Sequence, residues 1–151
     1  MFVEYSTEVD ASLSQVEKSL DQVRAHVEEW ADIAYREGEQ LRARVGPSET
    51  IAREVKLTIG IAEIHRSGLV YPIHWTASGA SLLFPELEAD LILSQTSSHS
   101  TTLTLRGTYQ PPMGALGRLA DRAVLGRVAD ATVADWMERL AVAVSTDSTV
   151  P

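Results

Sequence analysis

The sequence predicts one α+β domain in which an antiparallel sheet of about six or seven strands packs against a long C-terminal helix. Two observations support this fold class. From residue 52 to residue 109, apolar and polar residues alternate in successive runs, which is typical of strands with one buried and one solvated face. The segment 113–144 instead repeats apolar residues at helical spacing along a broad stripe, which suits a helix lying across a sheet. We expect the domain to cover 1–145 and a disordered polar tail to follow at 146–151.

The N-terminal part is predicted to form a strand followed by two short helices. Residues 2–9 alternate as a half-buried strand does. Asp10 or Ser12 can cap a helix over 12–22, and a second helical pattern follows it. The stretch 39–45 fits either another strand or an extension of that helix, and its alternation favours the strand.

Four alternating runs form the rest of the expected sheet. "HRSG" at 65–68 and "SSHS" at 97–100 supply turns, and Pro111 ends strand pairing because it has no N–H to donate. In each run, alternate apolar residues are expected on the same buried face of the sheet. These residues are, run by run, Val55, Leu57, Ile59 and Ile61; Leu69, Tyr71, Ile73 and Trp75; Leu87, Ala89, Leu91 and Leu93; and Leu103, Leu105 and Tyr109.

Composition limits the classes of partner. The net charge of −8 argues against nucleic acid, and the absence of cysteine excludes disulfides and thiolate metal sites. No apolar run approaches the ~20 residues that span a bilayer, and no secretory signal is evident. We therefore expect a cytoplasmic monomer or homodimer with no integral membrane segment, no cofactor and no metal.

Three phrases carry a resemblance to a known family. They are "YPIHWTASG" at 71–79, "LFPELEADLIL" at 83–93 and "YQPPMGALGRLADRAVLGRVADATV" at 109–133. With the order of elements, they resemble the START-like or SRPBCC superfamily, in particular its bacterial polyketide cyclase/dehydrase and lipid-transport type. The resemblance implies a helix-grip fold, in which a curved sheet wraps around the C-terminal helix. It also implies a cavity for a hydrophobic small molecule such as a lipid, sterol-like or polyketide-like compound; only some members are enzymes.

A cavity between sheet and helix would be lined by the inward-facing residues. The same side chains would equally fill a dry core, and the resemblance favours the cavity. Arg127 either lies on the surface or reaches inward to an anionic head group. The predicted ligand-binding residues are Trp30, Glu63, Tyr71, Ile73, Trp75, Leu91, Leu93, Gln95, Leu105, Tyr109, Leu119, Ala123, Arg127 and Val128.

Strand alternation also predicts where polar groups would meet the cavity. Without bulges, Glu63, Gln95 and Thr101 fall on the apolar face near one end of the sheet. They would then orient a ligand at the mouth of the cavity. A single bulge would reverse this placement, and the groups would be solvated strand ends instead.

Other titratable residues are interpreted as surface groups. His74 is expected to face outward between Ile73 and Trp75. Glu86, Glu88 and Asp90 alternate along a polar strand face, where a solvated surface is a better interpretation than an acid–base pair or a cation site.

Three functions remain open from the sequence. The first is binding of a hydrophobic or amphipathic molecule for carriage or sequestration. The second is a polyketide cyclase or aromatase that moves protons with Tyr71, Glu63 or a nearby histidine; no catalytic residue is assigned. The third is a protein-interaction module with a filled core.

Overall fold

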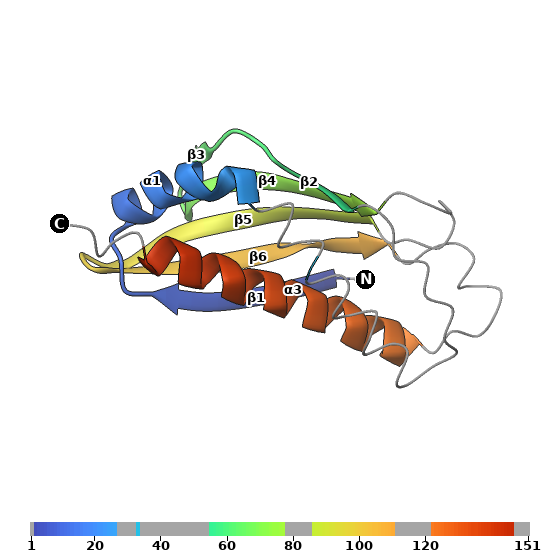
Figure 1. Ribbon diagram of the computed structural model, residues 1–151. Coiled ribbons are helices and arrows are strands. Elements are labelled where there is room, and N and C mark those ends of the chain that lie inside the picture. Colours follow the sequence, from blue (N-terminus) through green and yellow to red (C-terminus); the bar gives the residue numbers. More distant parts are fainter. Residues whose placement is uncertain (1, 27–32, 34–54, 78–85, 111–121, 147–151) are drawn as a thin grey trace.

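The computed structural model describes residues 2–26, 33, 55–77, 86–110 and 122–146 of the 151-residue chain. These residues form an α+β fold in which one antiparallel sheet is covered on one face by helices (Figure 1). The fold class predicted from the sequence is confirmed. The second short helix expected after the first strand, and the stretch 39–45, lie almost entirely outside the described residues.

The sheet has six described strands in the order β1, β6, β5, β4, β2, with β3 paired to β4. The strands are curved, and every described pair is antiparallel (Figure 1). Their bounds are β1 Phe2–Val9, β2 Val55–Ile59, β3 Glu63–His65, β4 Gly68–Ala77, β5 Glu86–Ser97 and β6 Ser100–Gln110.

Helix α1 (Leu13–Val23) begins at a well-defined cap. The backbone N–H of Gln15 donates to Ser12 Oγ at 3.4 Å, and the backbone N–H of Ser12 donates to Gln15 Oε1 at 2.9 Å. This reciprocal capping box satisfies two N–H groups at the start of the helix and confirms one of the two predicted caps. A short 3₁₀ helix, Arg24–His26, follows directly.

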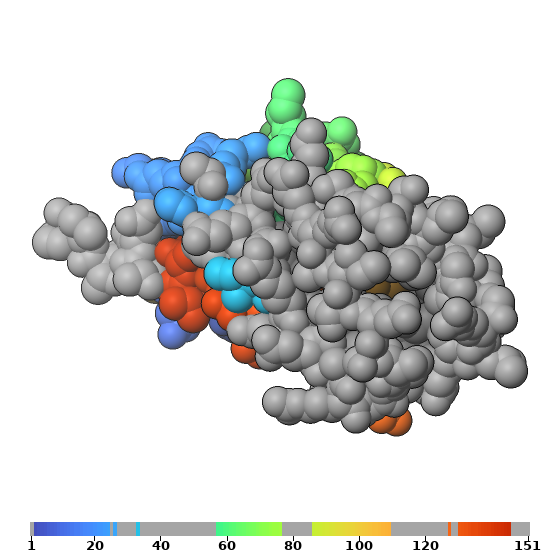
Figure 2. Space-filling model, turned by 45° about the vertical axis from the view of Figure 1, so that its right-hand side comes forward, coloured from blue at the N-terminus to red at the C-terminus, as the bar shows by residue number. Residues whose placement is uncertain are grey.

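Helix α3 (Arg122–Thr146) lies across the inner face of the sheet (Figure 1). Its 25 residues correspond to about 37 Å of helix. It contacts β1, β6 and α1, and Figure 2 shows α1 beside the C-terminal half of α3. Its buried face comprises Thr132, Val133, Trp136, Met137, Leu140 and Val144, spaced as one side of a helix requires.

Directly paired residues of antiparallel strands share a face, so the register defines rows of side chains across the inner face. The row at the end where β4 finishes and β5 begins is called the tryptophan row here; it consists of Leu57, Trp75, Leu87 and Tyr109. The next row holds two small residues, Ala89 and Gly107. Beyond it, Leu91 pairs with Leu105 and Leu93 with Leu103.

The first alternating run after residue 52 ends earlier than predicted. Ile59 lies opposite Ile73, but Glu63 lies opposite Val70, so the chain gains one residue relative to β4 between these pairs. One extra residue exchanges the two faces of a strand. Ile61, expected on the buried face, is 87% exposed.

Gly107 permits a close approach between β5 and β6. A Cβ atom there would lie 2.3 Å from the carbonyl oxygen of Glu88 and 2.5 Å from the Cβ of Ala89. We expect Gly107→Ala to lower the free energy of unfolding by about 1–3 kcal/mol because the strands must move apart. Urea unfolding would measure this loss.

Thr108→Ala, at the next and outward-facing position, is the matched control and should change stability by less than about 0.5 kcal/mol. A Gly107→Ala variant as stable as its control would contradict the close approach.

Candidate ligand-binding site

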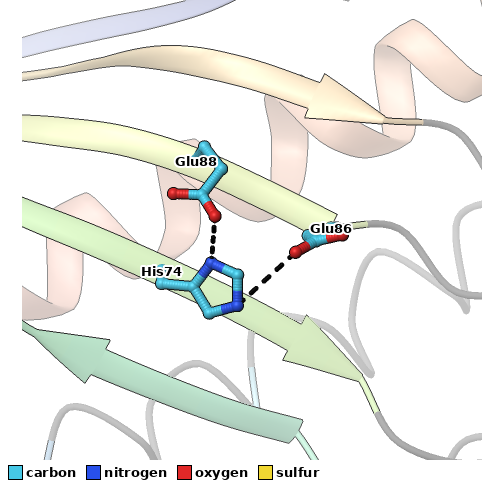
Figure 3. Close-up of side chains that lie close together, drawn as sticks. All are labelled: His74, Glu86 and Glu88. Atoms are coloured by element: carbon cyan, nitrogen blue, oxygen red, sulfur yellow. Dashed lines mark hydrogen bonds and ion pairs between the residues drawn. The ribbon is translucent and has the colours of Figure 1, made fainter.

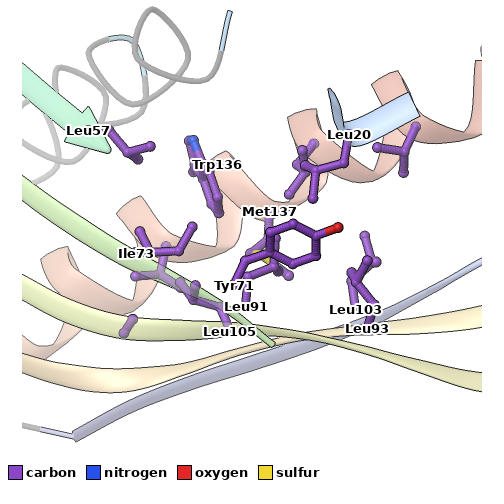
Figure 4. Packing of buried hydrophobic residues seen from close by; sticks show 14 of the residues in the cluster. Leu20, Leu57, Tyr71, Ile73, Leu91, Leu93, Leu103, Leu105, Trp136 and Met137 are labelled. Atoms are coloured by element: carbon purple, nitrogen blue, oxygen red, sulfur yellow. The ribbon is translucent and has the colours of Figure 1, made fainter. Parts of the chain in front are cut away.

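One half of the interior is solidly packed. A side chain beside a cavity wide enough for water keeps some accessible surface. The residues here keep none, and Figure 4 shows several of them in contact range around Tyr71 and Met137. We call this group the packed cluster; it comprises Leu91, Leu93, Leu103, Leu105, Met137, Leu140 and Val144.

Three residues predicted to line the cavity therefore lie in the packed cluster. Leu91, Leu93 and Leu105 are each 0% exposed. A ligand could reach them only if α1 or α3 moved. Their role in ligand binding stays a prediction. Their burial shows that they fill the core.

The tryptophan row differs from the packed cluster because its side chains keep accessible surface. Trp75 is 5% exposed, Ala89 in the neighbouring row is 8% exposed, and Tyr109 is only half-buried. Ala89 and Gly107 add little side-chain volume above the sheet at this point. The side chains at this end of the sheet are therefore slightly less completely covered than those of the packed cluster.

Trp136 fixes one side of the tryptophan row. Its ring centroid lies 6.4 Å from that of Trp75, with the ring planes tilted by 56°. This separation and tilt are among the favourable arrangements of aromatic pairs. Trp136 is itself fully covered, so it holds Trp75 in position from the helix side.

Tyr71 is the clearest titratable group on the inner face. Burial raises the pKa of its hydroxyl above 10.0, and the negative charges of Glu17 and Asp21 raise it further, while Arg24 lowers it. The Arg24 guanidinium lies 5.7 Å from the centre of the Tyr71 ring. Tyr71 is therefore neutral near pH 7 and is not available as a base there.

The predicted group of three polar residues at one end of the sheet forms only in part. Glu63 lies on the outer face because of the extra residue before β3, and its carboxylate is 3.2 Å from His65 Nε2. Gln95 and Thr101 do share the inner face, but they pair at the end far from the tryptophan row. Gln95 is exposed, while Thr101 is buried and donates to the Ala11 carbonyl at 2.8 Å.

The remaining predicted residues are only partly described. Arg127 is exposed on α3, in agreement with the surface interpretation. Trp30 and Leu119 lie outside the described residues, as do the side chains of Ala123 and Val128. Ile73 is buried in the row next to the tryptophan row.

The outer face carries a cluster of metal-ligating groups that the sequence does not predict as a unit. His74 of β4 lies between Glu86 and Glu88 of β5 (Figure 3). The sequence pattern indicates that all three face outward, but not that β4 and β5 pair with His74 opposite Glu88. Only the length of the connection between these strands could have set that register.

Solved structures share this fold at low sequence identity. A conserved protein from Geobacillus kaustophilus is 13% identical, with a TM-score of 0.61, and the match covers 97% of this chain and 96% of that one. The protein TTHA0849 from Thermus thermophilus is 15% identical, with a TM-score of 0.51 and coverage of 99% and 100%. The aromatase/cyclase Zhui from Streptomyces sp. R1128 is 12% identical with a TM-score of only 0.37, covering 98% of this chain and 90% of Zhui.

No family model matches the chain, and no curated protein is similar to it. The likeness to the first two structures shows the fold and does not extend to activity. Among the helices of the described residues, none combines the length and apolar character that crossing a membrane requires.

The raised pKa of Tyr71 predicts a pH dependence of stability. Folding favours the neutral hydroxyl, so this contribution is complete below pH 10 and is lost as the pH rises through the folded-state pKa. Above about pH 10 the wild-type free energy of unfolding should therefore fall more steeply than that of Tyr71→Phe, by up to about 1.4 kcal/mol per pH unit. Urea unfolding at a series of pH values measures the two slopes.

Tyr5→Phe is a companion variant, because burial and the nearby carboxylate of Glu138 also raise the pKa of Tyr5. It should likewise make the slope above about pH 10 shallower than that of the wild type. Parallel pH profiles for wild type and Tyr71→Phe would contradict the burial of the Tyr71 hydroxyl.

Proposed function

We propose that this protein binds a hydrophobic or amphipathic small molecule between its sheet and α3, at the tryptophan row, for carriage or sequestration. The observation that carries the proposal is the contrast within one interior. The packed cluster has no accessible surface, whereas Trp75, Leu87 and Ala89 retain some. The resemblance to the START-like superfamily also supports the binding of a hydrophobic small molecule between the sheet and α3.

The chemistry of the inner face indicates what kind of molecule fits. Every described inward-facing residue of β1, β2, β4, β5 and β6 is uncharged. A charged ligand group buried there would meet no opposite charge from the sheet, which is costly. Affinity would come from apolar burial, at roughly 25 cal/mol per Å². The inserted part of the ligand is therefore apolar, and any polar head group remains outside the sheet face.

The cyclase hypothesis receives less support from these residues. Glu63 and His74 lie on the outer face, away from the tryptophan row, and Tyr71 keeps its proton near neutral pH. No described residue at the tryptophan row is a carboxylate or histidine. We therefore favour binding over catalysis.

The proposal is tested with freshly purified protein in native mass spectrometry, followed by titration with the neutral dye Nile red. We expect a retained small molecule or, in stripped protein, saturable binding of one dye per chain. Trp75→Leu should weaken dye binding about tenfold, because losing about 50 Å² of apolar contact costs about 1.3 kcal/mol.

Leu103→Val is the matched control because it alters a buried apolar side chain of the packed cluster. It should leave the dye affinity within twofold, with circular dichroism confirming that both variants are folded. If the protein retains no small molecule and shows no saturable dye binding, the proposal is overturned. The interaction module with a filled core is then the better account.

A further inference from the structure

Three potential metal ligands converge on the outer face of the sheet, on the side away from the tryptophan row. His74 lies in the middle of β4, and Glu86 and Glu88 lie two positions apart in β5 (Figure 3). Strand alternation puts both glutamates on one face, and the register puts Glu88 directly opposite His74. One nitrogen or oxygen atom from each residue lies within 4.8 Å of the others.

The two ring nitrogens of His74 have different partners. Nδ1 is hydrogen-bonded to the Glu88 carboxylate, while Nε2 lies 3.5 Å from Glu86 Oε1. Two ligands each about 2.0–2.2 Å from a tetrahedral zinc ion are separated by about 3.4 Å. The gap between Nε2 and the Glu86 oxygen therefore matches one edge of a zinc coordination sphere.

We propose that His74 and Glu86 bind a zinc ion, or a divalent first-row metal of similar preference, on the outer face of the sheet. His74 Nε2 and a Glu86 carboxylate oxygen are the protein ligands, and water completes the coordination. The Glu88 carboxylate accepts a hydrogen bond from the Nδ1–H group, which leaves Nε2 free to bind metal and fixes the ring orientation. An imidazole beside carboxylates suits zinc better than magnesium or calcium, which prefer oxygen ligands alone.

The site is accessible and is held by rigid elements. The side chains of His74, Glu86 and Glu88 are 41%, 47% and 62% exposed, so an ion can enter from solvent. His74 and Glu88 are paired with each other inside the sheet, and Glu86 begins β5 and pairs with Gln110 of β6. Without a metal, the same contacts are exposed ion pairs and hydrogen bonds, and each of these stabilises the fold little.

A bound ion would lie on the opposite face of the sheet from the tryptophan row. His74 lies between Ile73 and Trp75 in the sequence, and both neighbours point into the interior. Zinc would cross-link β4 to β5 directly beneath the tryptophan row. Because the ion binds the folded state, saturating zinc should raise the midpoint temperature of unfolding. This inference rests on the outer face alone and stands independently of the proposed ligand.

The test uses the full chain freed of metal with EDTA and titrated with zinc chloride by isothermal calorimetry. We expect one zinc per chain, and a cobalt(II) titration should give a visible absorption band with the same stoichiometry. His74→Gln should abolish binding, and Glu86→Gln should weaken it more than tenfold. Glu88→Ala should weaken it about tenfold, as loss of an orienting carboxylate does elsewhere.

Two further variants separate the specific roles from general charge effects. Glu88→Gln keeps an oxygen that can accept the hydrogen bond from the Nδ1–H group of His74. This variant should therefore bind zinc more tightly than Glu88→Ala. Asp90→Asn removes one negative charge from the same face of β5 without touching the site, and should keep wild-type affinity within twofold. Circular dichroism shows whether each variant is folded.

Two results would overturn the proposal. One is zinc binding to folded His74→Gln with wild-type affinity, which would assign the metal to His26, His65 or His99. The other is no saturable binding to the wild-type chain at zinc concentrations up to about 1 mM, equivalent to an affinity weaker than about 4 kcal/mol.

Discussion

The register between β4, β5 and β6 is the constraint on which the rest of the structure depends. Side chains change face at every residue, so a shift of one position would bring the packed cluster to the surface and turn the glutamates of β5 inward. The same pairing that places Leu91 against Leu105 also places His74 against Glu88. The apolar core and the outer-face cluster are thus two products of one hydrogen-bonded ladder.

Along the strands, the inward-facing side chains differ in how completely they are covered. Helices α1 and α3 both cover the half that contains the packed cluster, where apolar side chains interlock without accessible surface. Toward the tryptophan row, the sheet has the small residues Ala89 and Gly107 beside the rings of Trp75 and Tyr109. Both halves belong to one buried apolar cluster, and the packed cluster is its most completely covered part.

Local patterns in the sequence predict much of this fold, because they report which face of an element is buried. The strand over 2–9, the Ser12 cap and the inward-facing residues of β4 and β5 are confirmed. Alternation assigns Glu63 to the wrong face because periodicity cannot detect one extra residue at 60–62. The His74–Glu88 pairing depends on strands whose register no local pattern encodes. How closely α3 approaches the sheet above Ala89 depends on tertiary packing, which alternation does not describe.

The irregular end of β2 has a consequence for self-association. Arg24 reaches from the end of α1 and donates to the carbonyl oxygens of Ile59 and Gly60 at 3.2 and 3.3 Å. Just beyond, Ile61 and Ile64 are 87% and 88% exposed on a protruding segment (Figure 2). Unpaired backbone carbonyl groups beside exposed apolar side chains allow a strand of another chain to pair with the edge of a sheet. By occupying those two oxygens, the Arg24 guanidinium leaves fewer free acceptors for another strand at this end of β2.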